Sequence, residues 1–228
     1  MPQIPPRIPP QIPFDLPHRE AFEAEDYLVT ASNQAAVDRI DRWPDWTGSH
    51  CTIFYGAAGC GKTHLTHVWQ RKSAARRIGT AQMNLQDIAG NLIIEDIDAI
   101  SGNMQAQEDL FHLYNRQKET GGFLMLTARH HPKSWSLALP DLASRMLAAM
   151  AIEIGAPDDD LLAALVIKQF MDRQVTVPEE VVSYLLPRIE RSFEAVRNIV
   201  DEIDTLALAR KRKITIPLVR DLLDREAG

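Results

Sequence analysis

The segment GAAGCGKT, from Gly56 to Thr63, constrains the fold of this 228-residue chain more than any other part of it. It satisfies the pattern G-x-x-x-x-G-K-[ST], and it lies between a short apolar, β-rich run, 51–55, and a run with helical periodicity from His64 to about Arg77. Glycines in such a loop let backbone N–H groups close around phosphates, and the helix N-terminus that follows favours anions. The pattern therefore predicts a strand, a phosphate-binding loop and a helix, in that order.

The side chains of this loop have distinct expected roles. Lys62 is expected to reach the outer phosphates of a nucleotide, and Thr63 to hold Mg²⁺ at the start of the helix. Cys60 has two interpretations, a thiol made reactive by the helix N-terminus or a small residue that fits the loop, and we favour the second. The glycines expected to bind the phosphates are Gly56, Gly59 and Gly61.

A second apolar strand, predicted over 91–96, ends in the carboxylates of Glu95 and Asp96. Ligands of open α/β sheets bind at the carboxyl ends of the strands. One carboxylate can bind Mg²⁺ through water while the other orients an attacking water, which are the two tasks that phosphoryl transfer requires there. We therefore expect both acids to be catalytic and Glu95 to be a metal ligand with Thr63. The alternative is a strand that merely ends in solvated acids.

Helical and strand-like segments alternate up to about residue 156, which predicts an α/β core with a parallel sheet flanked by helices. An amphipathic helix is expected over 105–118 and a buried strand over 123–127. After Pro157 the strand signals stop, and helices are expected over 158–173, 178–189, 192–210 and 216–225. The expected organisation is a proline-rich arm over 1–20, a nucleotide-binding core over 21–156 and a small all-α lid over 157–228.

Composition excludes several classes of function. A net charge of −6 lacks the field that draws a protein onto phosphate backbones, so direct sequence-specific DNA binding is not expected. The two cysteines and the absence of a secretory signal indicate a reducing, cytoplasmic location. No apolar run approaches the roughly 20 residues that cross a bilayer, so no membrane association is expected.

Three stretches resemble the DnaA/Hda family of AAA+ proteins. They are YLVTASNQAAVDRI ahead of the phosphate loop, GAAGCGKTHLTHVW around it, and QEDLFHLYN, from Gln107 to Asn115, after the acidic strand. Their order and spacing agree with the family, and the resemblance runs from about Phe22 to the C-terminus. It implies an AAA+ core with a helical lid, and ADP or ATP with Mg²⁺ as cofactors.

The resemblance also implies roles for single residues. It places Asn33 against the adenine, His64 in the helix that follows the phosphate loop, and Thr127 where the γ-phosphate is sensed. A lid arginine is expected near the nucleotide, and we favour Arg191 over Arg197. For Thr127 the alternative is a β-branched residue that simply ends a strand.

Arg145, in DLASRM, resembles the arginine finger of the family, which reaches the nucleotide of a neighbouring subunit and stabilises charge there. The alternative is an ordinary arginine on a surface helix. Three departures from the family matter. The acidic pair is Glu-Asp where DnaA has Asp-Asp, only 33 positions separate Lys62 from Glu95, and no helix-turn-helix domain follows the lid before Gly228. We therefore expect nucleotide binding but no grip on single-stranded DNA and no initiator activity, and we leave the chain's own ATPase activity open.

The proline-rich arm contains QIPFDL, which resembles the hexapeptide that binds the bacterial sliding clamp. Such a peptide places Gln11 on polar groups and sinks Ile12, Phe14 and Leu16 into apolar pockets, while prolines reduce the entropy lost on docking. The alternative is a linker whose apolar residues pack on the core.

The resemblance implies a regulator that docks on the DNA polymerase III beta sliding clamp, meets DnaA and promotes hydrolysis of DnaA-bound ATP. The alternative function is an AAA+ loading or adaptor factor that delivers a replication partner such as a helicase to DNA. A self-sufficient ATPase is a third hypothesis, and homodimer formation is left open.

Overall fold

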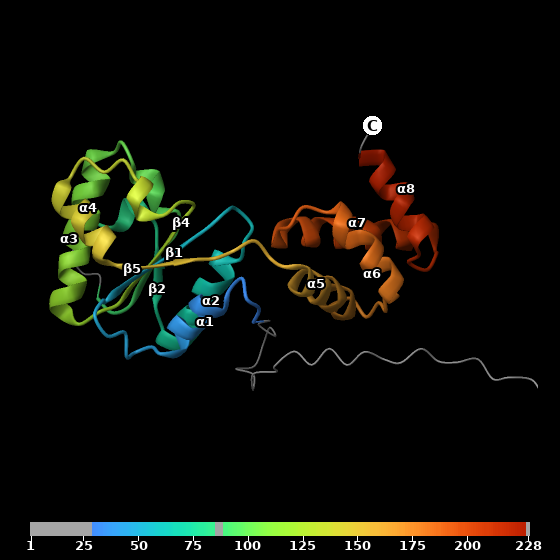
Figure 1. Ribbon diagram of the computed structural model, residues 1–228, viewed down its shortest axis with the longest axis horizontal. Coiled ribbons are helices and arrows are strands. Elements are labelled where there is room, and N and C mark those ends of the chain that lie inside the picture. The colour runs from blue at the N-terminus through green and yellow to red at the C-terminus, as the bar shows by residue number, and fades with distance from the viewer. Residues whose placement is uncertain (1–28, 85–88, 227–228) are drawn as a thin grey trace, which may run out of the picture.

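A five-stranded parallel sheet, in the order β2-β3-β4-β1-β5, forms the centre of the N-terminal lobe (Figure 1). The computed structural model describes residues 29–84 and 89–226. The expectation of an α/β core with a parallel sheet is confirmed. The strands are β1 (Cys51–Tyr55), β2 (Arg76–Ile78), β3 (Leu92–Ile94), β4 (Leu124–Ala128) and β5 (Met150–Glu153).

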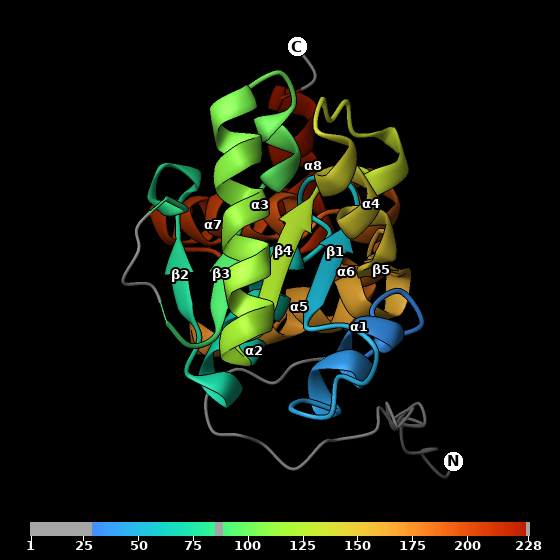
Figure 2. The ribbon, with the colours of Figure 1, turned by 90° about the vertical axis from the view of Figure 1, so that its left-hand side faces the viewer.

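Helices cover both faces of this sheet because the strand side chains alternate between two apolar clusters. In β4, for example, Leu124 and Leu126 join the cluster under α3 and α4, whereas Met125 joins the cluster under α1 and α2. Figure 2 shows α3 and α4 in front of the sheet. The helices are α1 (Gln34–Asp41), α2 (Lys62–Ser73), α3 (Met104–Thr120) and α4 (Pro140–Ala148), with short 3₁₀ turns η1 (Thr80–Gln82), η2 (Ile97–Ile100) and η3 (Pro132–Ser134).

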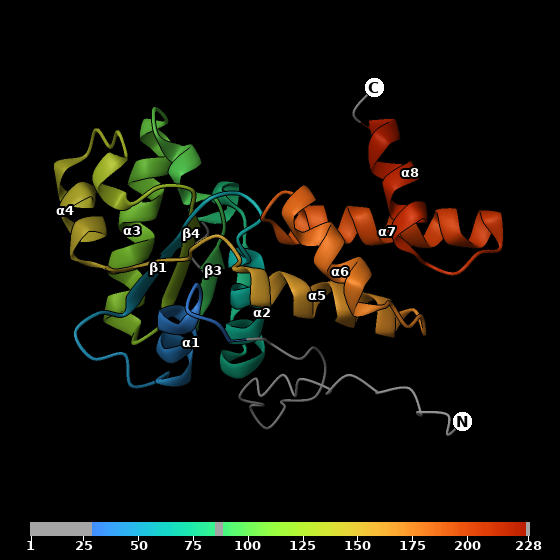
Figure 3. The same cartoon turned by 45° about the vertical axis from the view of Figure 1, so that its right-hand side comes forward.

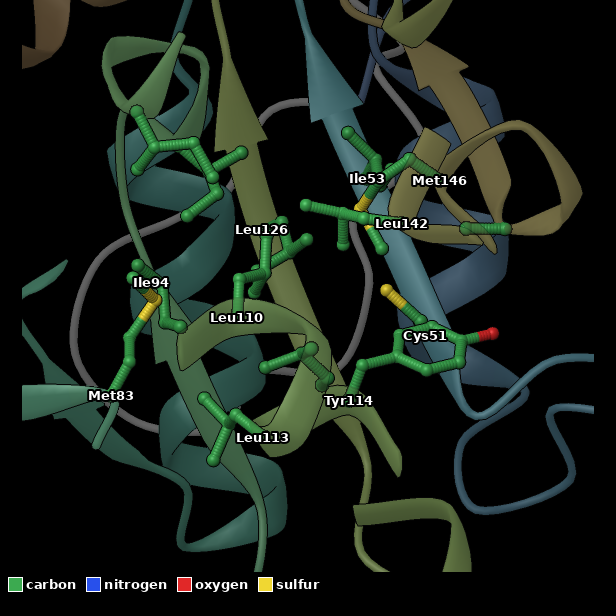
Figure 4. Packing of buried hydrophobic residues seen from close by; sticks show 14 of the residues in the cluster. Cys51, Ile53, Met83, Ile94, Leu110, Leu113, Tyr114, Leu126, Leu142 and Met146 are labelled. Atoms are coloured by element: carbon green, nitrogen blue, oxygen red, sulfur yellow. The ribbon is translucent and has the colours of Figure 1, made fainter. Parts of the chain in front are cut away.

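In the apolar cluster under α3 and α4, side chains of the strands pack against one face of each of the two helices (Figure 4). Leu110 and Leu113 of α3 and Leu142 and Met146 of α4 are fully buried. Each such side chain contributes about 1.5–3 kcal/mol when it leaves water. The packing fixes α4 against α3 on the side of the sheet opposite α2.

The apolar cluster under α1 and α2 anchors α2, the helix that follows the phosphate loop. Trp69 of α2 stacks on Trp46, with ring centroids 5.2 Å apart and an interplanar angle of 14°. The indole N–H of Trp46 donates to the carbonyl of Arg39 at 2.7 Å, which ties α1 into the same cluster. An aromatic pair of this kind stabilises by about 0.5–1.5 kcal/mol beyond the area that it buries, so it helps to hold α2 against α1 and the sheet.

The C-terminal lobe is all helical and has an apolar cluster of its own (Figure 3). Two of its helices begin at side-chain caps, where Asp158 Oδ1 accepts from Leu161 N at 2.9 Å and Ser192 Oγ accepts from Ala195 N at 3.0 Å. None of the helices within 29–84 and 89–226 is long and apolar enough to span a membrane. The lobe contains α5 (Asp159–Asp172), α6 (Glu179–Leu185), η4 (Leu186–Arg188), α7 (Phe193–Arg210) and α8 (Ile216–Glu226).

Two strands differ from the sequence-based expectation. The predicted helix to about Arg77 is wrong at its end, because α2 stops at Ser73, Ala74 turns to φ +52°, and Arg77 lies in β2. Strand β5 was not predicted. The sequence of β2 contains two arginines in three residues, so it lacks the apolar pattern of a strand. Strand β5 is short and half-exposed, so its pattern is weak as well. Both segments become strands because they pair with a neighbouring strand, β3 and β1 respectively.

Candidate functional site

The phosphate-loop segment runs from the end of β1 to the start of α2. Gly59 and Gly61 adopt φ values of +71° and +99°, which side chains with a Cβ rarely accept. Gly56 N donates to the carbonyl of Ala128 at 3.3 Å, which joins the start of the loop to the end of β4. The loop therefore lies at the carboxyl ends of the central strands, the position expected for a ligand site in such a sheet.

Lys62 is folded back into this loop. Its ammonium donates to the carbonyl of Gly56 at 2.7 Å and to that of Ala57 at 2.8 Å, and the residue is only 8% exposed. The two carbonyls satisfy the ammonium in this structure, and a phosphate whose oxygens replaced them would keep its charge paired. Thr63 is exposed at the first turn of α2, and His64 beside it is half-buried.

Glu95 lies directly after β3 and is held by three side chains of the same lobe. Arg77 of β2 forms an ion pair with it, and Thr66 Oγ1 lies 3.2 Å from its Oε1. Burial raises the pKa of the Glu95 carboxyl, but hydrogen bonds from Arg77, Thr63 and Thr66 and the charge of Arg77 together outweigh it, so the pKa is lowered. Glu95 is therefore an anion whose charge is already matched by a protein cation.

Asp96 and Thr127 are also brought together. Asp96 is exposed at φ +51°, and its N–H donates to Thr127 Oγ1 at 3.0 Å. Thr127 is 2% exposed and sits in β4, between β3 and β1. The hydroxyl predicted to sense the γ-phosphate is thus tied to the backbone of the acidic segment.

The first turn of α7 packs directly on the phosphate loop. Phe193 N donates to the carbonyl of Gly59 at 2.9 Å. A Cβ atom at Gly59 would lie 2.6 Å from Cβ of Ser192, and one at Gly61 would lie 3.0 Å from the ring of Phe193. The loop and the helical lobe are in contact without room for a side chain, so a displacement of either reaches the other.

The predicted lid arginines are placed differently from each other. Arg191 precedes α7 and pairs with Asp159 of α5, Nη2 to Oδ1 at 2.9 Å, with both side chains more than half exposed. Arg197 is exposed near the start of α7, one turn after Phe193. Arg191 thus lies beside the turn that touches the phosphate loop, and its expected contact with the nucleotide stays a prediction.

Asn33 is buried at the start of α1, where its Oδ1 accepts from Thr30 N at 3.0 Å. The preceding residue, Ser32, accepts from Gly155 N at 3.0 Å. Gly155 follows Ile154, whose carbonyl would lie 2.3 Å from a Cβ at Gly56. The segment that contains Asn33 therefore lies beside the phosphate loop, on the side of β5.

Arg145 lies on α4, whose buried side chains belong to the cluster on the opposite face of the sheet from α2 (Figure 2). Its Nε donates to Asn115 Oδ1 at 2.9 Å, and its guanidinium carbon is 4.5 Å from the centroid of the Phe111 ring. Both partners come from α3, within the segment that resembles the DnaA/Hda family. The arginine is half-buried and oriented by side chains rather than free in solvent.

Several functional candidates were not identified from the sequence. The sequence pattern predicts a helix at Arg77, which lies in β2, and it indicates Ser192 and Phe193 only as the start of a helix. Asn115 and Phe111 lie in a stretch that signalled the family, but nothing local links them to α4. The clamp-motif residues, Gln11, Ile12, Phe14 and Leu16, lie outside the described residues.

Comparison with known proteins agrees with the fold described above. Residues 158–223 match the family model described as Hda, lid domain. The chain is similar to domain III of the replication initiation protein DnaA from Thermotoga maritima, with a TM-score of 0.75 and 17% sequence identity over 88% of this chain and 94% of that one.

Two further solved structures are similar. AMPPCP-bound DnaA from Aquifex aeolicus has a TM-score of 0.67 and 17% identity, covering 78% of this chain and 63% of that one. A variant of RuvB from Thermotoga maritima has a TM-score of 0.69 and 14% identity, covering 85% and 67%. These likenesses establish a fold that DnaA and RuvB share, and the family match covers most of the helical lobe.

Proposed function

Since the chain is an AAA+ protein related to DnaA and Hda, we propose that it binds an adenine nucleotide and promotes hydrolysis of ATP bound to DnaA, in the cytoplasm and while docked on the beta sliding clamp. The observation that carries this proposal is the position of Arg145. Its helix packs on the face of the sheet opposite the chain's own α2, and Asn115 and Phe111 hold its guanidinium. Such an arginine suits a nucleotide on another subunit.

Nucleotide binding rests on the loop and the residues around it. Gly59 and Gly61 supply backbone freedom, Lys62 supplies a buried ammonium, and Thr127 lies across from the acidic segment. The related DnaA structure with bound AMPPCP supports an adenine nucleotide as the ligand. Bound Mg²⁺ would neutralise phosphate charge, and the hydroxyl of Thr63 is a kind of oxygen donor that it prefers. The carboxylate of Glu95 is another such donor, but it is already paired with Arg77.

Action on the partner's nucleotide needs only one positive group at the right place. A guanidinium delivered between subunits stabilises charge on the transferred phosphoryl group and accelerates hydrolysis by about 10³ to 10⁵. The hydrogen bond from Asn115 and the Phe111 ring restrict the orientations of Arg145 before the partner arrives. Less entropy is then lost when the two proteins meet.

The test is hydrolysis of labelled ATP bound to DnaA, measured with this protein and with clamp loaded on DNA. We expect wild type to accelerate hydrolysis, and the double variant Gln11→Ala/Phe14→Ala to lose this acceleration because it no longer docks on the clamp. If wild type binds nucleotide but gives no acceleration, the regulator proposal fails. Binding to a helicase without affinity for the clamp would instead support a loading or adaptor factor.

A further inference from the structure

Strand β2 places an arginine against the acidic end of β3. In the parallel pairing Arg77 is opposite Ile93, whose side chain belongs to the cluster under α1 and α2. Glu95 is two positions beyond Ile93, and strand side chains repeat every second residue, so Arg77 and Glu95 point to the face that carries α2. Their ion pair follows from the order of the strands.

The same arginine reaches the first turns of α2. Arg77 Nη2 donates to Thr66 Oγ1 at 3.0 Å, and that hydroxyl lies 3.2 Å from Glu95 Oε1 while the guanidinium contacts Oε2. Both carboxylate oxygens of Glu95 are therefore engaged. The two charged side chains are about one-quarter exposed, 26% and 25%, so solvent screens the pair only in part.

We propose that Arg77 is a built-in counter-cation for Glu95 that competes with Mg²⁺ for this carboxylate, so that nucleotide binding depends only weakly on Mg²⁺. The inference rests on the nucleotide-binding function proposed above. A guanidinium is always charged and its planar fork matches a carboxylate. A divalent cation at Glu95 has to displace this fork or approach it against like charge.

A purely architectural role for the pair predicts something different. If Arg77 only fastened the edge strand β2 to β3, its removal would lower stability and weaken nucleotide binding equally with and without metal. The adjacent Arg76 provides a matched control, because it is exposed and opposite Leu92, whose side chain belongs to the other face of the sheet. Arg77→Met removes the charge and keeps most of the aliphatic stem.

The experiment titrates the full chain with a fluorescent ADP analogue, once in Mg²⁺ and once in EDTA. For wild type and Arg76→Met, the Kd values in Mg²⁺ and in EDTA should agree within about threefold. Arg77→Met should bind at least about tenfold more tightly in Mg²⁺ than in EDTA. A factor of about ten is the low end of the effect of one close charge pair. Arg77→Lys, which keeps the charge, should behave as wild type. Equal ratios for wild type and Arg77→Met would overturn the proposal.

A second variant leaves Arg77 in place, so it tests the proposal even if Arg77→Met folds poorly. Glu95→Gln removes the charge but keeps the shape, and it should change the ratio of the two Kd values by less than about threefold, because Arg77 occupies the carboxylate. Weakening confined to Mg²⁺ would show that Glu95 serves the metal and would overturn the proposal. Absence of binding by wild type in both buffers would overturn nucleotide binding itself.

Discussion

Arg145 and Asn115, 30 positions apart on different helices, are joined by a hydrogen bond of 2.9 Å from Nε to Oδ1. The bond leaves the terminal nitrogens of the guanidinium to make other contacts, one of which is a weaker bond of 3.4 Å to the carbonyl of Asp141. Asn115 thus acts as a positioning residue for the arginine that we propose to act on the partner's nucleotide.

Asn115→Ala should therefore reduce the acceleration of ATP hydrolysis on DnaA by about tenfold, which is the effect of losing one charge-assisted hydrogen bond that orients a catalytic group. The affinity of the Asn115→Ala variant for nucleotide should stay at the wild-type value. Gln105→Ala, in the exposed first turn of the same helix, is the control and should retain full activity. Full activity of Asn115→Ala would show that the asparagine does not position Arg145.

Lys62→Met should weaken binding of the fluorescent nucleotide by about 30-fold or more, because a buried charged partner is worth roughly 2 kcal/mol or more. The ammonium now bonded to the carbonyls of Gly56 and Ala57 is expected to turn to the phosphates. Lys72→Met, at the exposed end of the same helix, should bind as wild type does. Similar affinities for the two variants would contradict this assignment of Lys62.

The contact between the phosphate loop and α7 can be tested with two glycines of similar conformation. Gly59 has φ +71° and Gly48 has φ +84°, but only Gly59 is packed, with Ser192 2.6 Å from the position of an added Cβ. Gly48→Ala should cost about 1–2 kcal/mol from backbone strain alone, and Gly59→Ala should cost clearly more. Urea unfolding measures both. Equal losses would mean that the helical lobe does not rest on the loop.

His50 should make stability depend on pH below neutrality. Burial lowers its pKa from 6.5 more than the hydrogen bond to the carbonyl of Tyr114 raises it, and Lys118 lowers it further. The unfolded chain therefore takes up this proton first, so the free energy of unfolding falls as the pH drops below 6.5 toward the folded-state pKa. In His50→Gln the fall between about pH 7.5 and 5.5 should be smaller. Parallel profiles for the two proteins would refute this.

Much of the fold could be predicted because its signals are local. The strand at 51–55, the glycine loop and the helix after it are specified by one continuous pattern, and the structure has β1, the turn and α2 in that order. The helices of the C-terminal lobe have clear periodicity and side-chain caps such as Ser192. In these segments residues next to each other in the chain decide the type of element, although not the end of α2, which stops at Ser73 instead of at about Arg77.

The contacts that complete the site depend on neighbours distant in the sequence. Arg77 meets Glu95 only because β2 is placed beside β3, and Ser192 meets Gly59 only because the helical lobe lies against the loop. A chain segment that contains two arginines carries no local sign of either strand or ion pair. Tertiary pairing decides both contacts, so the partners of these residues could not be predicted from the sequence.

Arg145 is proposed to act on a nucleotide that another subunit holds. The deciding measurement is the single-turnover rate of hydrolysis of DnaA-bound ATP with clamp on DNA, for wild type, Arg145→Ala and Arg188→Ala. Arg188 serves as the control because it stacks on Tyr184 in the helical lobe. We expect Arg145→Ala to lose about 10³-fold or more of the acceleration and Arg188→Ala to keep it. Undiminished acceleration by Arg145→Ala, with nucleotide binding intact, would rule out this role for the arginine.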